Sequence, residues 1–133
     1  MVESTSELVE FDAEAALTAA RETAGDAVYS FIEYTSEEYN VLYASPETLE
    51  MYGGRDAMID HFDEIHSYVH IDFTERDLFS EELLPHAGEV RTIVTRQDQL
   101  TLIRLFHGDG GVVVSLAPDE PIVPLLNAVE SAL

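Results

Sequence analysis

The chain has 133 residues, of which 27 are Asp or Glu, six are Lys or Arg, and 46% are hydrophobic. The resulting net charge of −21 does not indicate an acidic disordered segment, because such segments lack the apolar residues needed for a core. The absence of cysteine excludes disulfides, thiolate zinc sites and cysteine nucleophiles, and the length fits one globular domain over residues 1–133.

The first third of the chain predicts one helix and two strands. Residues 12–24 form the helix, with Asp12 as the N-cap. Residues 27–35 and 38–45 are rich in aromatic and β-branched residues, which is typical of strands. The acidic, serine-containing residues 1–10 that precede the helix are expected to be frayed.

The middle third is predicted to be helical. Ser45 followed by proline is a strong helix start and predicts a short helix over 46–52. A second helix is expected over 55–68, where apolar residues recur at helical spacing. Residues 71–84 are less regular, and we expect one or two helical turns within 77–84.

The last third predicts a three-stranded meander followed by a helix. The strands are expected over 90–96, 100–107 and 112–117, and the glycine-rich residues 108–111 are expected to form a hairpin turn. The final helix starts after residues 119–121. One face of this helix is apolar and is expected to be buried: Ile122, Leu125, Leu126, Val129 and Leu133.

The order of predicted elements is α-β-β-α-β-β-β-α. This order predicts an α/β sandwich of the α+β type, with a five-stranded, mainly antiparallel sheet and helices on both faces. It resembles the roadblock and profilin-like group, for which the strand order would be 2-1-5-4-3. The resemblance covers nearly the whole chain at the level of topology. It implies a homodimer made by joining sheets and packing helices, with small GTPases or subunits of complexes as partners.

A second resemblance rests on three stretches of sequence. VLYASPETLEMYGG, GEVRTIVTRQDQLTLIRLF and GGVVVSL are similar to segments of small haloarchaeal proteins of unknown function. The lysine-free, acidic composition likewise resembles cytoplasmic proteins of extreme halophiles. In molar salt the Debye length falls to roughly 3 Å, so that repulsion among the carboxylates is screened.

The ends and hydropathy of the chain indicate a cytoplasmic protein. The start MVESTSELVEF has no basic region followed by a long apolar run, as a secretory signal would. No stretch approaches the roughly 18 apolar residues of a membrane span. The six arginines are scattered and form no basic patch in the sequence, so nucleic-acid binding is not expected.

The strongest candidate site for chemistry lies in the second middle helix. His66 and His70 are four residues apart and would share one face of a continuous helix, with Asp63 one turn before His66. Imidazoles and a carboxylate are suitable ligands for a divalent transition metal, and His61 could join them. The alternative is that these residues are the solvent-facing side of an amphipathic helix. No other cofactor is expected.

The remaining motifs have simpler explanations. His86 and His107 could join such a site or act as acid and base with a carboxylate, although each falls at a loop or strand end. The glycines of residues 108–111 lack the lysine and following helix of a phosphate-binding loop, so a turn explains them. Six tyrosines without flanking basic residues favour a core or interface role over a base-stacking platform.

Two functions follow as hypotheses. The first is a non-catalytic protein-interaction or regulatory adaptor module, homodimeric and located in a halophile cytoplasm, because the sequence has no catalytic motif and its strands are apolar on both faces. The second is a metal- or small-ligand-sensing domain that uses His61, Asp63, His66 and His70. A transcriptional accessory protein would need a basic groove, which the sequence does not indicate.

The charge predicts that folding depends on salt. Below a few hundred millimolar KCl, unscreened repulsion among the carboxylates should cause substantial loss of structure. Circular dichroism from molar KCl to dilute buffer measures this. A spectrum that stays constant over the whole range would contradict the prediction.

Overall fold

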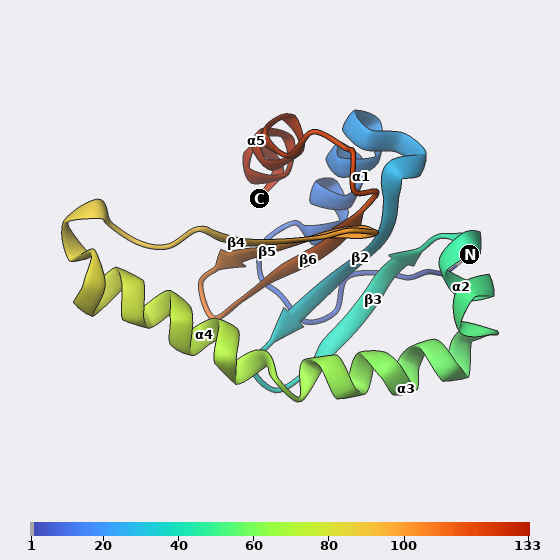
Figure 1. The fold of residues 1–133 in the computed structure, drawn as a ribbon, viewed down its shortest axis with the longest axis horizontal. Coiled ribbons are helices and arrows are strands. Elements are labelled where there is room, and N and C mark those ends of the chain that lie inside the picture. The colour runs from blue at the N-terminus through green and yellow to red at the C-terminus, as the bar shows by residue number, and fades with distance from the viewer. Residues whose placement is uncertain (1) are drawn as a thin grey trace.

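The computed structural model describes residues 2–133 and contains a six-stranded antiparallel sheet with helices on both faces (Figure 1). The strand order is β1-β3-β2-β6-β5-β4. The strands are β1 (Val2–Glu3), β2 (Val28–Thr35), β3 (Tyr39–Ala44), β4 (Thr92–Gln97), β5 (Leu100–His107) and β6 (Gly110–Leu116). The helices are α1 (Ala13–Ala24), α2 (Pro46–Tyr52), α3 (Arg55–His66), α4 (Val69–Leu78) and α5 (Ile122–Ala132), with short turns η1 (Gly25–Ala27), η2 (Phe79–Leu83) and η3 (Pro85–Ala87).

The predicted α+β class and element order are confirmed. The five expected strands pair in the order β3-β2-β6-β5-β4, which is the order 2-1-5-4-3 that the topological resemblance implied. The predicted caps are also present. The Asp12 carboxylate accepts a hydrogen bond from the backbone N–H of Ala15, and the Ser45 hydroxyl accepts one from Thr48.

One face of the sheet is covered by α1 and α5, which pack against each other. The side of α1 that faces the core consists of small residues, and Ala13, Ala16 and Ala20 are fully buried. Small side chains let the helix approach the strands closely. The core between these helices and the sheet includes Phe31 of the central strand β2 and Leu125 of α5.

The other face is covered in part by α2 and α3. Met58 of α3 is fully buried and packs with Val41 and Ala44 of β3. Ile32 of β2 packs against this second cluster, so the central strand is apolar on both sides and is covered on both sides, as expected for such a strand.

The N-terminal segment differs from the expectation that residues 1–10 fray. Within the described residues, Val2–Glu3 form β1 and pair antiparallel with β3. The following loop surrounds the carboxylate of Glu33, a fully buried residue of β2. Its hydrogen-bond donors are the Ser6 hydroxyl, the backbone N–H groups of Glu7, Leu8 and Val9, and the Asn40 side-chain amide. A carboxylate with this many donors holds the segment against the sheet.

The glycine-rich turn is shorter than predicted. Gly108 has φ of 64° and forms the turn with Asp109, whereas Gly110 and Gly111 belong to β6. A Cβ atom on Gly111 would lie 1.9 Å from the carbonyl oxygen of Leu105. The two strand glycines are therefore needed for close approach of the backbones and not for the turn.

The helical middle departs most from the prediction. The expected helix over 55–68 ends at His66, and a separate helix, α4, follows from Val69 and continues into the π-helical turn η2. We call residues 69–87 the arm, because α4 runs beyond the edge of the sheet and η2 lies at its far end (Figure 1). No helix in residues 2–133 is long and apolar enough to cross a membrane.

The buried carboxylate of Glu33 leads to a stability prediction. Burial by itself raises the pKa of Glu33, but hydrogen bonds, chiefly from Asn40 and the backbone N–H groups of Glu7 and Leu8, reverse the effect and leave it lowered. Glu33→Gln should lower the free energy of unfolding at neutral pH by about 1–3 kcal/mol. The difference should shrink as the pH falls through the folded-state pKa, since the wild type then loses its charge.

Chemical denaturation of both proteins between neutral and acidic pH measures this effect. Glu37→Gln is the matched control, because Glu37 is exposed in the neighbouring turn. Equal stability of Glu33→Gln and the wild type at neutral pH would show that the carboxylate does not hold the N-terminal segment.

Candidate functional site

The structure does not assemble the predicted metal site. Asp63 and His66 lie in α3, but Ser67 and Tyr68 interrupt the helix and His70 belongs to α4. The four-residue spacing of the histidines therefore does not correspond to one helix turn. Among residues 2–133, no three His, Asp or Glu side chains are grouped so that they could hold a metal ion.

Each predicted ligand near the sheet has another partner instead. The Tyr39 hydroxyl of β3 donates to Asp63 Oδ1 at 2.6 Å, and His66 Nε2 lies 2.9 Å from the Thr35 carbonyl oxygen. Burial, and next the hydrogen bond to Asp63, raise the pKa of Tyr39 above its ordinary value, so that the hydroxyl stays a donor. These contacts attach α3 to the sheet.

The other three histidines are also separate from any cluster. His61 Nδ1 lies 2.7 Å from the Tyr52 hydroxyl, which links α3 to α2. His86 is exposed in η3, and exposed His107 at the end of β5 makes an edge contact with the ring of Phe11 at 4.8 Å between centroids. The expectation that His86 and His107 join one site finds no support in this geometry.

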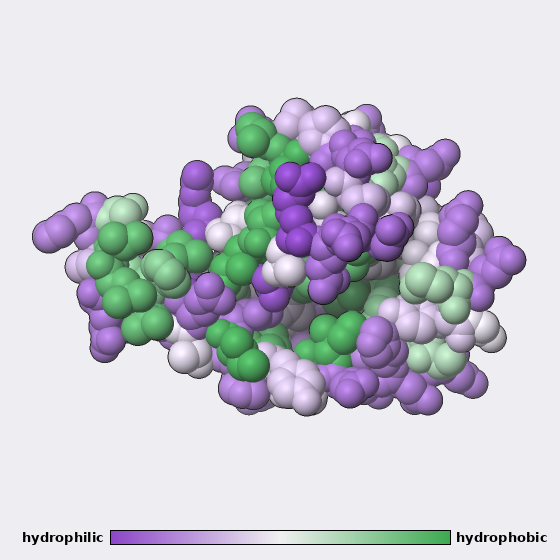
Figure 2. Space-filling view, in the orientation of Figure 1, coloured by the Kyte–Doolittle hydropathy of each residue, from purple (hydrophilic) through white to green (hydrophobic). Residues whose placement is uncertain are grey.

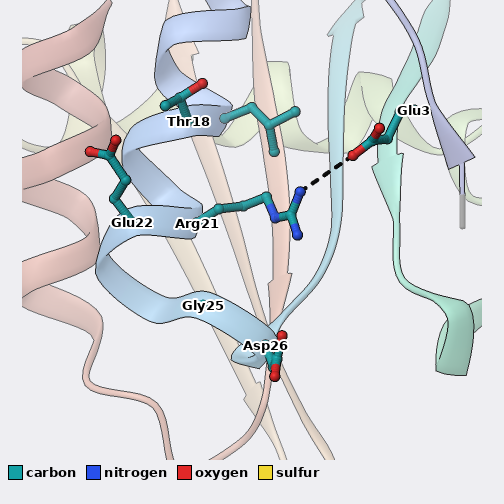
Figure 3. Close-up of a pocket in the computed structure, with 7 residues that line it drawn as sticks. Glu3, Thr18, Arg21, Glu22, Gly25 and Asp26 are labelled. Atoms are coloured by element: carbon teal, nitrogen blue, oxygen red, sulfur yellow. Dashed lines mark hydrogen bonds and ion pairs between the residues drawn. The ribbon is translucent and has the colours of Figure 1, made fainter.

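Two shallow depressions lie on the surface. In the first, the Arg21 guanidinium covers the Tyr43 ring at 4.2 Å from its centroid, and its Nη1 lies 3.4 Å from Glu3 Oε1. Figure 3 shows Arg21 reaching from α1 towards Glu3, while Glu22 extends on the other side of the helix. Thr18, Glu22 and Asp26 also line this depression.

The second depression, of about 540 Å³, lies between the N-terminal loop and the β5–β6 turn. His107 and Asp109 are its ionisable residues on the turn side and Glu10 on the loop side. Within the described residues the His107 ring contacts the ring of Phe11, which also lines the depression, and forms no hydrogen bond with either carboxylate.

The most distinctive feature is the arm, whose root, residues 72–76 of α4, is attached to the sheet by an ion pair. Arg104 Nη1 of β5 lies 3.1 Å from Asp72 Oδ1 of α4, and both side chains are 18% exposed. Thr95 of β4 also accepts a hydrogen bond from Arg104. Burial raises the pKa of Asp72, and the positive charge of Arg104 opposes this rise.

Contacts between tilted aromatic rings also attach the root to the sheet. The Phe73 ring of α4 lies 5.8 Å from the Tyr34 ring and 5.7 Å from the Phe106 ring, measured between centroids. The Arg76 guanidinium covers Phe73 at 4.8 Å and donates to the Gly108 carbonyl oxygen at 3.2 Å. Burial, and then the charge of Asp72, raise the pKa of Tyr34, so this hydroxyl stays neutral.

The far end of the arm, residues 78–84, is called the tip. It has its main contacts with the arm itself, η2 with α4 and η3. Its apolar side chains are exposed: Leu78, Phe79, Leu83 and Leu84, with Leu83 at 53% and Leu84 at 56%. Figure 2 shows them as a green lobe that projects from the body. An exposed apolar surface of this kind makes the tip a candidate for an interaction site.

The comparisons place the chain in a family without giving a function. Residues 14–133 match a domain of unknown function, DUF7522, and the chain belongs to this family. A search of curated proteins finds no match. The match begins after the N-terminal segment that surrounds Glu33.

Sequence reasoning missed the arm because its apolar residues do not continue the stripe of α3. The sequence predicts an irregular stretch over residues 71–84, whereas the root is ordered by contacts with residues more than thirty positions away, such as Arg104. The one signal available was the concentration of large apolar residues between 78 and 84, which do not recur at a helix or strand period.

The ion pair at the root predicts a local effect of Asp72→Asn. The substitution leaves the largely buried Arg104 charge without its counter-charge, so opening of α4 should become about tenfold more frequent. Hydrogen exchange should accelerate in α4 and remain unchanged in α1 and α5. Asp77→Asn is the control, because Asp77 pairs with Arg76 but is 51% exposed; equal exchange in both variants would contradict a fastened root.

Proposed function

We propose that this protein is a non-catalytic protein-interaction or regulatory adaptor module that works as a homodimer in a salt-rich cytoplasm. The observation that carries the proposal is the arm, with a root fastened by Asp72 and Arg104 and a tip whose apolar residues are exposed. Because the root is ordered, the tip is held in a defined position, and less conformational entropy is lost when a partner binds.

Three further points support this function. Strand β4 pairs only with β5 within residues 2–133, so its other edge has backbone groups free to bind another chain. The histidines and depressions described above provide no arrangement for a reaction. The topological resemblance to the roadblock and profilin-like group, in which dimers form by joining sheets and packing helices, agrees with a homodimer.

The acidic surface supports the salt-rich cytoplasm. With a net charge of −21, two copies repel each other at low ionic strength, and screening at molar salt removes most of that repulsion. Salt also strengthens the apolar contribution of surfaces such as the tip when the anion is excluded from the protein surface. Association should therefore be strongest under the conditions in which the chain folds best.

Light scattering after size exclusion in molar KCl tests the proposal. The wild type should have the mass of two chains, and Leu83→Ser/Leu84→Ser should raise the dissociation constant at least about tenfold while the circular dichroism spectrum is retained. Met51→Ser is the control, since Met51 is 73% exposed on α2, away from the arm.

A wild-type protein that is monomeric at all concentrations and captures no stoichiometric partner in molar KCl would overturn the proposed function. A dimer that is insensitive to the tip substitution would show that another surface makes the interaction.

A further inference from the structure

A second apolar surface lies at the free edge of the sheet. Val94 of β4 is 39% exposed and Val123 of α5 is 64% exposed. Figure 2 shows a green band that runs from α5 down to the sheet edge, separate from the green lobe of the tip. The exposed apolar residues therefore include a projecting patch at the tip and one on the body, besides Met51 on α2, Ile65 on α3, and Tyr68 and Ile71 near the start of α4.

The two patches carry opposite charges at their margins. Arg91 and Arg96 are exposed on either side of Val94, and with Val123 these residues define the β4 edge surface. The tip contains Glu81 and Glu82, both exposed, and the chain has no Lys or Arg between positions 76 and 91. Two of the six basic residues of the chain are therefore exposed at one edge, where they can attract an acidic partner.

The arginines of this edge are available for a partner. The Arg91 side chain is 77% exposed although its Nη1 lies 3.0 Å from Glu130 Oε2. An ion pair this exposed contributes little stability and can be exchanged for another. Arg96 is also exposed, and its guanidinium donates to the carbonyl oxygen of Pro118 at 3.4 Å, which leaves its charge without a carboxylate in the described structure.

We infer that in the homodimer the tip of each copy docks on the β4 edge surface of the other copy. The tip glutamates face Arg91 and Arg96, and the tip leucines cover Val94. The inference rests on the homodimer proposed above and names its interface. The second copy is the occupant that fits, because one chain has both the acidic apolar tip and the basic apolar edge, and a two-fold axis makes the contact twice.

Charge reversal tests which surfaces meet. Arg91→Glu/Arg96→Glu should raise the dissociation constant about tenfold, because two attractions become repulsions at contact distance, where salt screens least. Glu81→Arg/Glu82→Arg should do the same. The dissociation constant of the combined four-residue variant should lie within about threefold of the wild-type value. Glu47→Arg/Glu50→Arg on exposed positions of α2 is the control for changed net charge.

Cross-linking gives a second test that does not depend on charge. The chain has no cysteine, so a Leu83→Cys copy mixed with a Val94→Cys copy should form a disulfide between the two copies on mild oxidation. Each variant alone should cross-link much less. Preferential cross-linking of Val94→Cys with itself would overturn the inference, since it would mean that two β4 strands lie side by side.

The outcomes separate this inference from the proposed function. If the wild type dimerises but neither charge reversal raises the dissociation constant, or the combined variant does not restore it, the interface named here is overturned and the homodimer still stands. A wild-type protein that never dimerises overturns both.

Discussion

The fold depends on the need to cover the central strand β2 on both of its faces. Phe31 packs with α1 and α5, while Ile32 packs with the cluster beneath α2 and α3. These neighbouring positions point to opposite layers because successive side chains of a strand alternate between the two faces of the sheet. Apolar residues on both sides make a two-layer arrangement insufficient, and the helices of the third layer follow from that constraint.

Three of the six basic residues attach segments to the body. Arg21 joins α1 to β1, Arg76 joins α4 to the β5–β6 turn, and Arg104 joins β5 to α4. In so acidic a chain, an arginine at such a junction relieves local repulsion as well as forming a contact. The root of the arm has the least exposed of these pairs, which is consistent with an arm held in a defined position.

Local signals predicted the elements whose causes are local. Asp12 and Ser45 act as caps as their sequence context indicated, and the β5–β6 hairpin turns at Gly108. The metal site and the frayed N-terminus were predicted from the same kind of signal and the structure differs from both. Tyr39 donates a hydrogen bond to Asp63, and His66 lies at hydrogen-bond distance from the Thr35 carbonyl oxygen. Five donors surround Glu33. All of these contacts join residues that are separated in the chain.

The sequence alone determined the fold class and the order of the elements, because the hydrophobic period, the helix caps and the turns are properties of short stretches of sequence. Only the tertiary structure decided where α3 ends, how the arm is fastened and which apolar side chains stay exposed. These depend on which residues meet after the sheet has formed. The break after His66 contains no Gly or Pro that would have signalled it, and the contact between Asp72 and Arg104 spans 32 positions.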